Sequence, residues 1–135
     1  MIYETRLLIP YNTPATAMAE AEILVNAGTV QLVEVEFPAG CCGLVHVVIY
    51  YLERQVWPSN PDSDFHGDGV TLSYTENVQL VDPPFSFTVK GWSFDDTYPH
   101  TPTVRMCVVP FGGTIQDMLS ILTIGPGGPV VETGG

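Results

Sequence analysis

The sequence predicts an all-β protein: a single antiparallel β-sandwich of about seven to nine strands in jelly-roll or immunoglobulin-like order, with a short C-terminal helix and an extended tail. Three observations predict this fold. Apolar and polar residues alternate with a period of two, β-branched and aromatic residues dominate these segments, and turns rich in proline and glycine separate them. The chain of 135 residues is long enough for one such domain with its own core.

The first part of the chain contains four predicted strands, at residues 3–9, 19–25, 30–37 and 44–52. In the third of them, the apolar positions shift phase between Leu32 and Val33, which predicts a β-bulge at that point. The fourth is apolar on both faces. We therefore expect it to be central in its sheet or to be covered by a second protein.

Three further segments each show one apolar and one polar face, as expected for strands that cover a core on one side. Their apolar faces consist of Val70, Leu72 and Tyr74, then of Phe85, Phe87 and Val89, and then of Val104, Met106 and Val108. These residues are the predicted core of the second part of the sandwich.

The predicted sandwich domain covers residues 1–110, and residues 111–135 are predicted to form a short amphipathic helix and a Gly/Pro-rich arm. Thr114 is a candidate N-cap, with Asp117 three residues later. One helical face would carry Ile115, Met118, Leu119 and Leu122. Two interpretations stay open: the helix caps an open end of the sandwich and the tail is disordered, or helix and arm bind a neighbouring subunit.

Composition excludes some classes of partner. Four Lys and Arg residues against fifteen Asp and Glu residues give a net charge of −11, which argues against nucleic acid and anionic membranes. There is no apolar run of about 18 residues, so no membrane span is expected, and no signal peptide is seen. The three cysteines, two of them adjacent at Cys41 and Cys42, predict free thiols and a reducing compartment.

The acidic segment NPDSDFHGDG, residues 60–69, is the candidate metal site. Asp62, Asp64 and Asp68 resemble the start of an EF-hand loop, with a glycine at the turn position, but Ser73 stands where that loop needs a glutamate. Clustered carboxylates repel one another until a cation relieves the repulsion. The segment is thus either a Ca²⁺ site or a solvated acidic turn, and no other cofactor is expected.

No catalytic motif is present, and we expect no enzymatic activity. The spacing permits, without favouring, an acid–base pair or zinc site in which His66 and His100 meet Asp64 or Asp96. His46 lies within a predicted strand and is expected to be packed or at an interface.

Aromatic residues at strand ends and in loops are the predicted partner-binding set, together with the apolar helix face: Trp57, Phe65, Trp92 and Tyr98. Such rings can anchor a protein interface, stack on sugar rings, or fill the ends of the sandwich core. The expected partner is the protein itself or another structural protein, with carbohydrate as the alternative.

Three sequence features, FPAGCCGLVHV, WPSNPD with the following GDG, and DDTYPHT, resemble those of small β-sandwich proteins encoded among the virion genes of phages and prophages. The resemblance covers about residues 3–110. It implies a structural capsid, decoration or appendage subunit that is located in the virion and assembled in the host cytoplasm. It supplies no site residues. The alternative function is a carbohydrate-binding module, calcium-assisted, that uses the loop aromatics.

Overall fold

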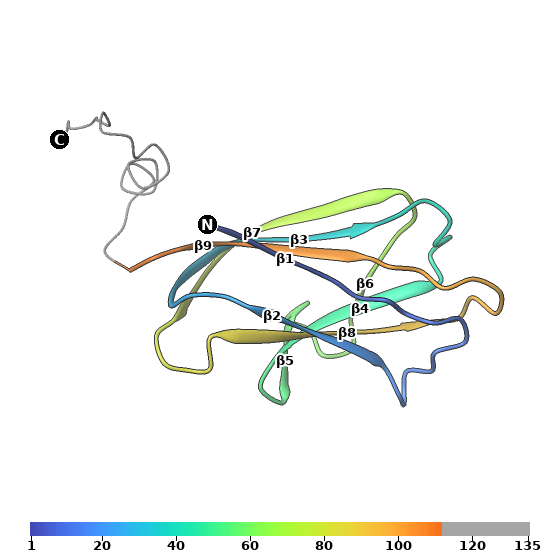
Figure 1. Cartoon of the computed structure of the whole chain (residues 1–135), viewed down its shortest axis with the longest axis horizontal. Coiled ribbons are helices and arrows are strands. Elements are labelled where there is room, and N and C mark those ends of the chain that lie inside the picture. The colour runs from blue at the N-terminus through green and yellow to red at the C-terminus, as the bar shows by residue number, and fades with distance from the viewer. Residues whose placement is uncertain (112–135) are drawn as a thin grey trace.

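A computed structural model describes residues 1–111 of the chain. These residues form nine strands and no helix, and the strands build two antiparallel sheets packed face to face (Figure 1). The predicted all-β sandwich is confirmed. The predicted C-terminal helix and arm lie outside the described residues.

The first sheet has the strand order β1-β9-β3-β7. Its strands are β1 (Ile2–Arg6), β9 (Thr103–Val109), β3 (Gly28–Phe37) and β7 (Val70–Leu80). The register of β3 shifts between Val30 and Leu32 against both of its neighbours. The predicted β-bulge is therefore present, one residue earlier than the phase of the apolar positions indicated.

The second sheet has the order β2-β8-β4-β5, and β6 pairs with β4 as well. Its strands are β2 (Ala19–Leu24), β8 (Ser86–Ser93), β4 (Val45–Tyr51), β5 (Arg54–Trp57) and β6 (Phe65–His66). The central position predicted for residues 44–52 is confirmed, because β4 lies between β8 and the two short strands β5 and β6. Those short strands fall in a part of the chain that the sequence indicated as turn and loop.

The core lies between the inner faces of the sheets. It contains alternate residues of the central strands, among them Val33, Val35, Phe37, Val45, Val47, Ile49, Phe87, Val89, Val104, Met106 and Val108. The inward faces predicted for β8 and β9 are thus confirmed. Burial of this apolar area is the main force that holds the two sheets together.

Strand β7 is the exception. Its register places Val70, Leu72 and Tyr74 opposite the inward-facing Phe37, Val35 and Val33, so the predicted face is correct. Yet Val70 is 38% exposed and Tyr74 46%. Opposite this edge the second sheet has only the short strands β5 and β6, and it leaves part of the inner face of β7 uncovered.

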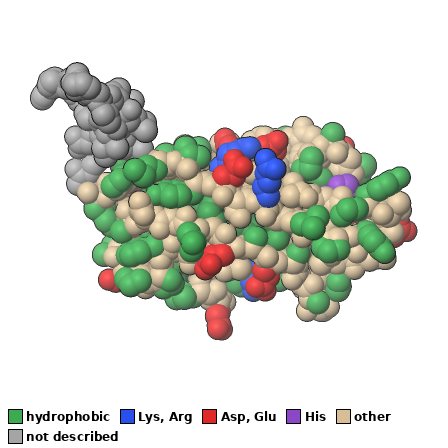
Figure 2. Space-filling view, viewed as in Figure 1, with side chains coloured by type: hydrophobic (Ala, Val, Ile, Leu, Met, Phe, Trp, Pro, Cys, Tyr) green, Lys and Arg blue, Asp and Glu red, His purple; other side chains and the backbone are tan. Residues whose placement is uncertain are grey.

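The outer face of the first sheet carries a charged network. The Arg105 guanidinium lies 3.1 Å from Glu4, 3.5 Å from Glu34 and 2.7 Å from Glu36. Figure 2 shows basic side chains seated among acidic ones over this sheet. Within residues 1–111 there is no helix with the length and hydropathy needed to cross a membrane.

Candidate functional site

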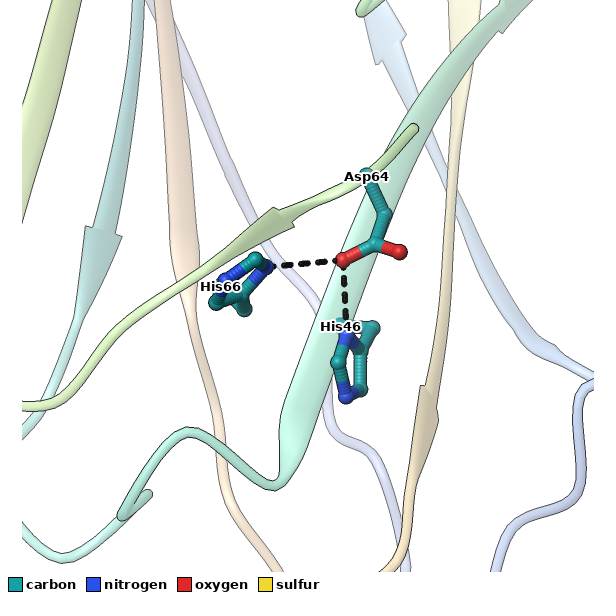
Figure 3. Close-up of side chains that lie close together, drawn as sticks. All are labelled: His46, Asp64 and His66. Atoms are coloured by element: carbon teal, nitrogen blue, oxygen red, sulfur yellow. Dashed lines mark hydrogen bonds and ion pairs between the residues drawn. The ribbon is translucent and has the colours of Figure 1, made fainter. Parts of the chain in front are cut away.

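Two histidines and an aspartate meet on the outer face of the second sheet (Figure 3). His46 lies in β4, His66 in β6, and Asp64 directly precedes β6. The Nδ1 atom of His46 is 2.6 Å from Oδ1 of Asp64, and Nδ1 of His66 is 3.0 Å from the same oxygen. The candidate ligand atoms all lie within 4.8 Å of one another.

Pairing between β4 and β6 creates this cluster. His46 pairs with His66, and Val47 pairs with Phe65. Because side chains alternate across a strand, Val47 and Phe65 point into the core and both histidines point outward. The buried Phe65 thus anchors the segment that carries Asp64 and His66.

Aromatic rings surround His46. The Trp92 ring, on the neighbouring strand β8, stacks on the imidazole with a centroid distance of 5.2 Å and an interplanar angle of 10°. Phe94 contacts the imidazole edge-on at 5.4 Å and is itself 62% exposed. These contacts restrict the orientation of the His46 ring. The side chains of His46 and Asp64 are 16% and 21% exposed, whereas that of His66 is 59% exposed.

The three aspartates predicted to bind Ca²⁺ do not come together as one set in the described structure. Asp68 Oδ1 accepts a hydrogen bond from the Gly40 N–H at 2.8 Å. Backbone hydrogen bonds from Cys42 and Gly40 hold the pKa of the Asp68 carboxyl below its usual value. Asp64 binds the two histidines, and Asp62 lines a small cavity of about 210 Å³ beside them. Of the predicted set, only Asp64 belongs to the histidine cluster.

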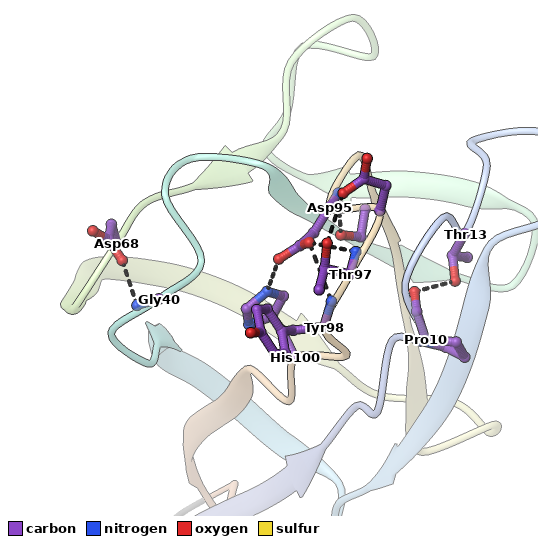
Figure 4. A network of polar contacts seen from close by, with 10 residues as sticks. Pro10, Thr13, Gly40, Asp68, Asp95, Thr97, Tyr98 and His100 are labelled. Carbon is purple, nitrogen blue, oxygen red and sulfur yellow. Dashed lines mark hydrogen bonds and ion pairs between the residues drawn. The ribbon is translucent and has the colours of Figure 1, made fainter.

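His100 lies in a different polar network, at the loop between β8 and β9 (Figure 4). Its Nε2 atom is 2.7 Å from Asp95, and both side chains are largely buried. Asp95 also accepts hydrogen bonds from the Thr97 and Tyr98 N–H groups. The hydrogen bond from His100, followed by those from the backbone, lowers the pKa of Asp95. His66 therefore lies beside His46. The meeting of His66 and His100 that the spacing permitted is not found in the described structure.

A groove runs between the sheets beneath β7. Its larger part has a volume of about 610 Å³ and is lined by Trp57, Phe65, Tyr74 and Glu76, among others. A second part of about 260 Å³ continues along the same strand to Leu80. Asp64 also lines the larger part, so the loop that precedes β6 separates the groove from the histidine cluster.

The predicted partner-binding aromatics fall into three environments. Trp57 and Phe65 are 5% and 8% exposed, so they are core residues at the floor of the groove and not exposed anchors. The interpretation in which rings fill the core holds for these two. Trp92 is half-buried beside His46, and Tyr98 is 66% exposed in the β8–β9 loop. The remaining members, Ile115, Met118, Leu119 and Leu122, lie outside the described residues.

No protein-family model matches the chain, and a search of curated proteins gave no match either.

Proposed function

We propose that the chain is a non-enzymatic structural subunit that self-associates, as a capsid, decoration or appendage protein of a virion. The exposed edge of β7 carries this proposal. β7 is eleven residues long, contains one charged residue, Glu76, and contains no proline or lysine. Among the described strands only β3 pairs with it, so its other edge is unpaired within residues 1–111. Monomeric proteins usually protect such an edge with charges, prolines or a covering segment.

The groove beneath this edge supports the same proposal. Tyr74 and Val78 face it and are 46% and 36% exposed, although their register belongs to the inner face of the sandwich. Trp57 forms part of its floor. A partner that enters the groove would complete a core that the second sheet leaves open, and it would remove apolar area from water.

Strand order supports a jelly roll in preference to an immunoglobulin-like sandwich. Strands β1 to β4 alternate between the two sheets, as do β6 to β9, and within residues 1–111 only β4 and β5 are consecutive strands that also pair. In immunoglobulin-like sandwiches several consecutive strands pair within one sheet. Jelly rolls are found in viral capsid proteins and in lectins, so the link from fold to virion is an analogy at the level of the fold.

The occupant that we infer for the groove is residues 112–135 of a second copy. The chain leaves the sandwich after Val109, which pairs with Thr29, and Thr29 in turn pairs with Gln79 of β7. The exit point is therefore about 10 Å, two strand spacings, from β7. A chain of this length reaches up to about 80 Å when extended, far enough for a neighbour. These residues contain only two charged side chains and several large apolar ones, which suits the apolar side chains of the groove, Trp57, Tyr74 and Val78.

Light scattering coupled to size exclusion tests this proposal with four proteins. They are the full chain, a version that ends at Phe111, Val78→Lys, and the control Leu24→Lys. Leu24 is 67% exposed on the other sheet and away from the groove. We expect oligomers for the full chain and Leu24→Lys, and monomers or weaker association for the other two. A full chain that stays monomeric at all concentrations would contradict self-association.

The carbohydrate-binding alternative has less support. Trp57 is buried, and Trp92 already has one ring face stacked on His46. Trp57 therefore offers no open aromatic platform for a sugar, and Trp92 has at most one ring face left for stacking.

A further inference from the structure

We propose that His46, Asp64 and His66 bind one divalent transition-metal ion, of the class to which Zn²⁺ belongs. Two imidazole nitrogens and one carboxylate oxygen are a donor set that suits Zn²⁺ and related borderline ions, and suits Ca²⁺ poorly. This metal site is independent of the proposed assembly role, and its test does not require self-association.

The distances fit such an ion. Asp64 Oδ1 lies 2.6 Å from Nδ1 of His46 and 3.0 Å from Nδ1 of His66. All three ligand atoms converge on one small region (Figure 3). In tetrahedral coordination with bonds of ~2.0–2.1 Å, neighbouring ligand atoms are ~3.3 Å apart. The ion can therefore enter if each contact to Asp64 lengthens by less than ~1 Å and the two histidine nitrogens, which lie within 4.8 Å of each other, adopt the same ~3.3 Å spacing. Rotation of the side chains can supply these shifts.

Packed aromatic side chains support the ligands of this site, and one of the ligands is exposed to solvent. His46 is fixed by the stacked Trp92 ring and by Phe94, and the segment before His66 is anchored by the buried Phe65. Ligands on strands with packed supports are positioned more firmly than ligands on free loops. The His66 side chain is 59% exposed, so solvent or a further ligand can reach the remaining coordination positions.

Electrostatics also favours a cation here. Asp62 lines the small cavity next to Asp64, and the whole chain carries a net charge of −11. Lys90, on the same face of β8, is engaged elsewhere: its Nζ lies 3.6 Å from Glu20 and 4.3 Å from the centre of the Tyr50 ring. A negative potential raises the local concentration of cations at such a surface.

Isothermal titration of the full chain with Zn²⁺, after treatment with a chelator, tests the site. The Cys42→Ser background is used throughout because Cys42 is an exposed thiol that could itself bind zinc. We expect one ion per chain, with affinity reduced at least tenfold in His66→Gln and in Asp64→Asn. The comparison variant Asp62→Asn should lower the affinity much less than Asp64→Asn does, because Asp62 adds negative charge nearby but is not one of the three ligands. Zn²⁺ should also raise the melting temperature of the parent and leave that of His66→Gln nearly unchanged.

A purely structural network of hydrogen bonds would give a different result. Such a network would connect β6 to β4 without binding Zn²⁺. Alternatively, the protein would bind Zn²⁺ with an affinity that His66→Gln does not change. Either outcome would overturn the proposal. His66 is exposed, so its glutamine variant is expected to fold, which circular dichroism checks. The test thus stays decisive even if Asp64→Asn proves unstable.

Discussion

Gly91 in β8 lies against Leu7 and Ile9 of the segment that follows β1. An added Cβ would lie 2.5 Å from Cδ1 of Ile9, 3.0 Å from Cδ2 of Leu7, and 2.9 Å from the carbonyl oxygen of His46. All three contacts are shorter than ordinary van der Waals distances. Gly91→Ala is therefore expected to force either the two side chains or the β4–β8 pairing beneath the histidine cluster to shift.

The size of the effect follows from two opposing contributions. Overpacking of a filled core costs about 1–3 kcal/mol. Replacement of glycine by alanine inside a strand stabilises the folded state by about 0.5–1 kcal/mol, because the unfolded chain loses less backbone entropy on folding. We expect Gly91→Ala to lower the free energy of unfolding by about 0.5–2 kcal/mol, because the clash with a backbone carbonyl cannot be relieved by a side-chain rotation.

Urea unfolding of a double-mutant cycle tests this reasoning. Ile9→Val removes the nearest clashing atom, Cδ1, and should alone cost about 0.5–1.5 kcal/mol. The double variant Gly91→Ala with Ile9→Val should then be more stable than the sum of the single effects, by about 1 kcal/mol. Additivity within about 0.3–0.5 kcal/mol would refute the argument, because residues that do not interact behave in that way.

Three further predictions concern charged and nucleophilic groups. Arg105→Met should reduce the free energy of unfolding by about 1–2 kcal/mol at low salt, and by less at high salt, because it removes three ion pairs and leaves their carboxylates clustered. The pKa of Asp95 is lowered in the folded state, so its stabilising effect is present above the unfolded value of about 3.9 and is lost as the pH falls further. Asp95→Asn should thus be less stable than the parent at neutral pH, and the difference should narrow in unfolding measurements below about pH 4. Thiol titration with a disulfide reagent should modify the exposed Cys42 in the native protein and Cys41 only on unfolding, since burial raises the pKa of the Cys41 thiol to about 11. Equal rates for the two thiols would contradict the placement of Cys41 in the core.

The fold could be predicted from the sequence where strands are long and have one buried and one solvent-exposed face. The alternation in β8 and β9 identified buried residues correctly, because a period of two reports which side chains share a face. The same period placed Val70, Leu72 and Tyr74 on the inner face of β7, but it could not show that the opposite sheet is too short there. Periodicity within one strand carries no information about what lies across from it.

The candidate site could be predicted only in part. Asp64 and His66 were identified as candidate chemistry, but their partner is His46, nearly twenty positions earlier, and two residue pairs between β4 and β6 bring them together. A strand as short as β6 has too few residues for a pattern of alternation. Trp57 and Phe65 are predicted at strand ends or in loops, and the sequence does not indicate their burial, since β5 and β6 lie among prolines and aspartates. One signal was available: His46 occupies an outward position in a strand otherwise rich in valine.

We propose that residues 112–135 of a second copy fill the groove beneath β7 and cover the edge of β7 that no described strand pairs with. Hydrogen–deuterium exchange of the β7 backbone amides, in the full chain and in the version that ends at Phe111, tests that claim most directly. We predict slow exchange across residues 70–80 in the full chain at high protein concentration, and fast exchange at the outward-facing amides on dilution or in the shortened version. Equal exchange of β7 in both proteins at every concentration would contradict the account.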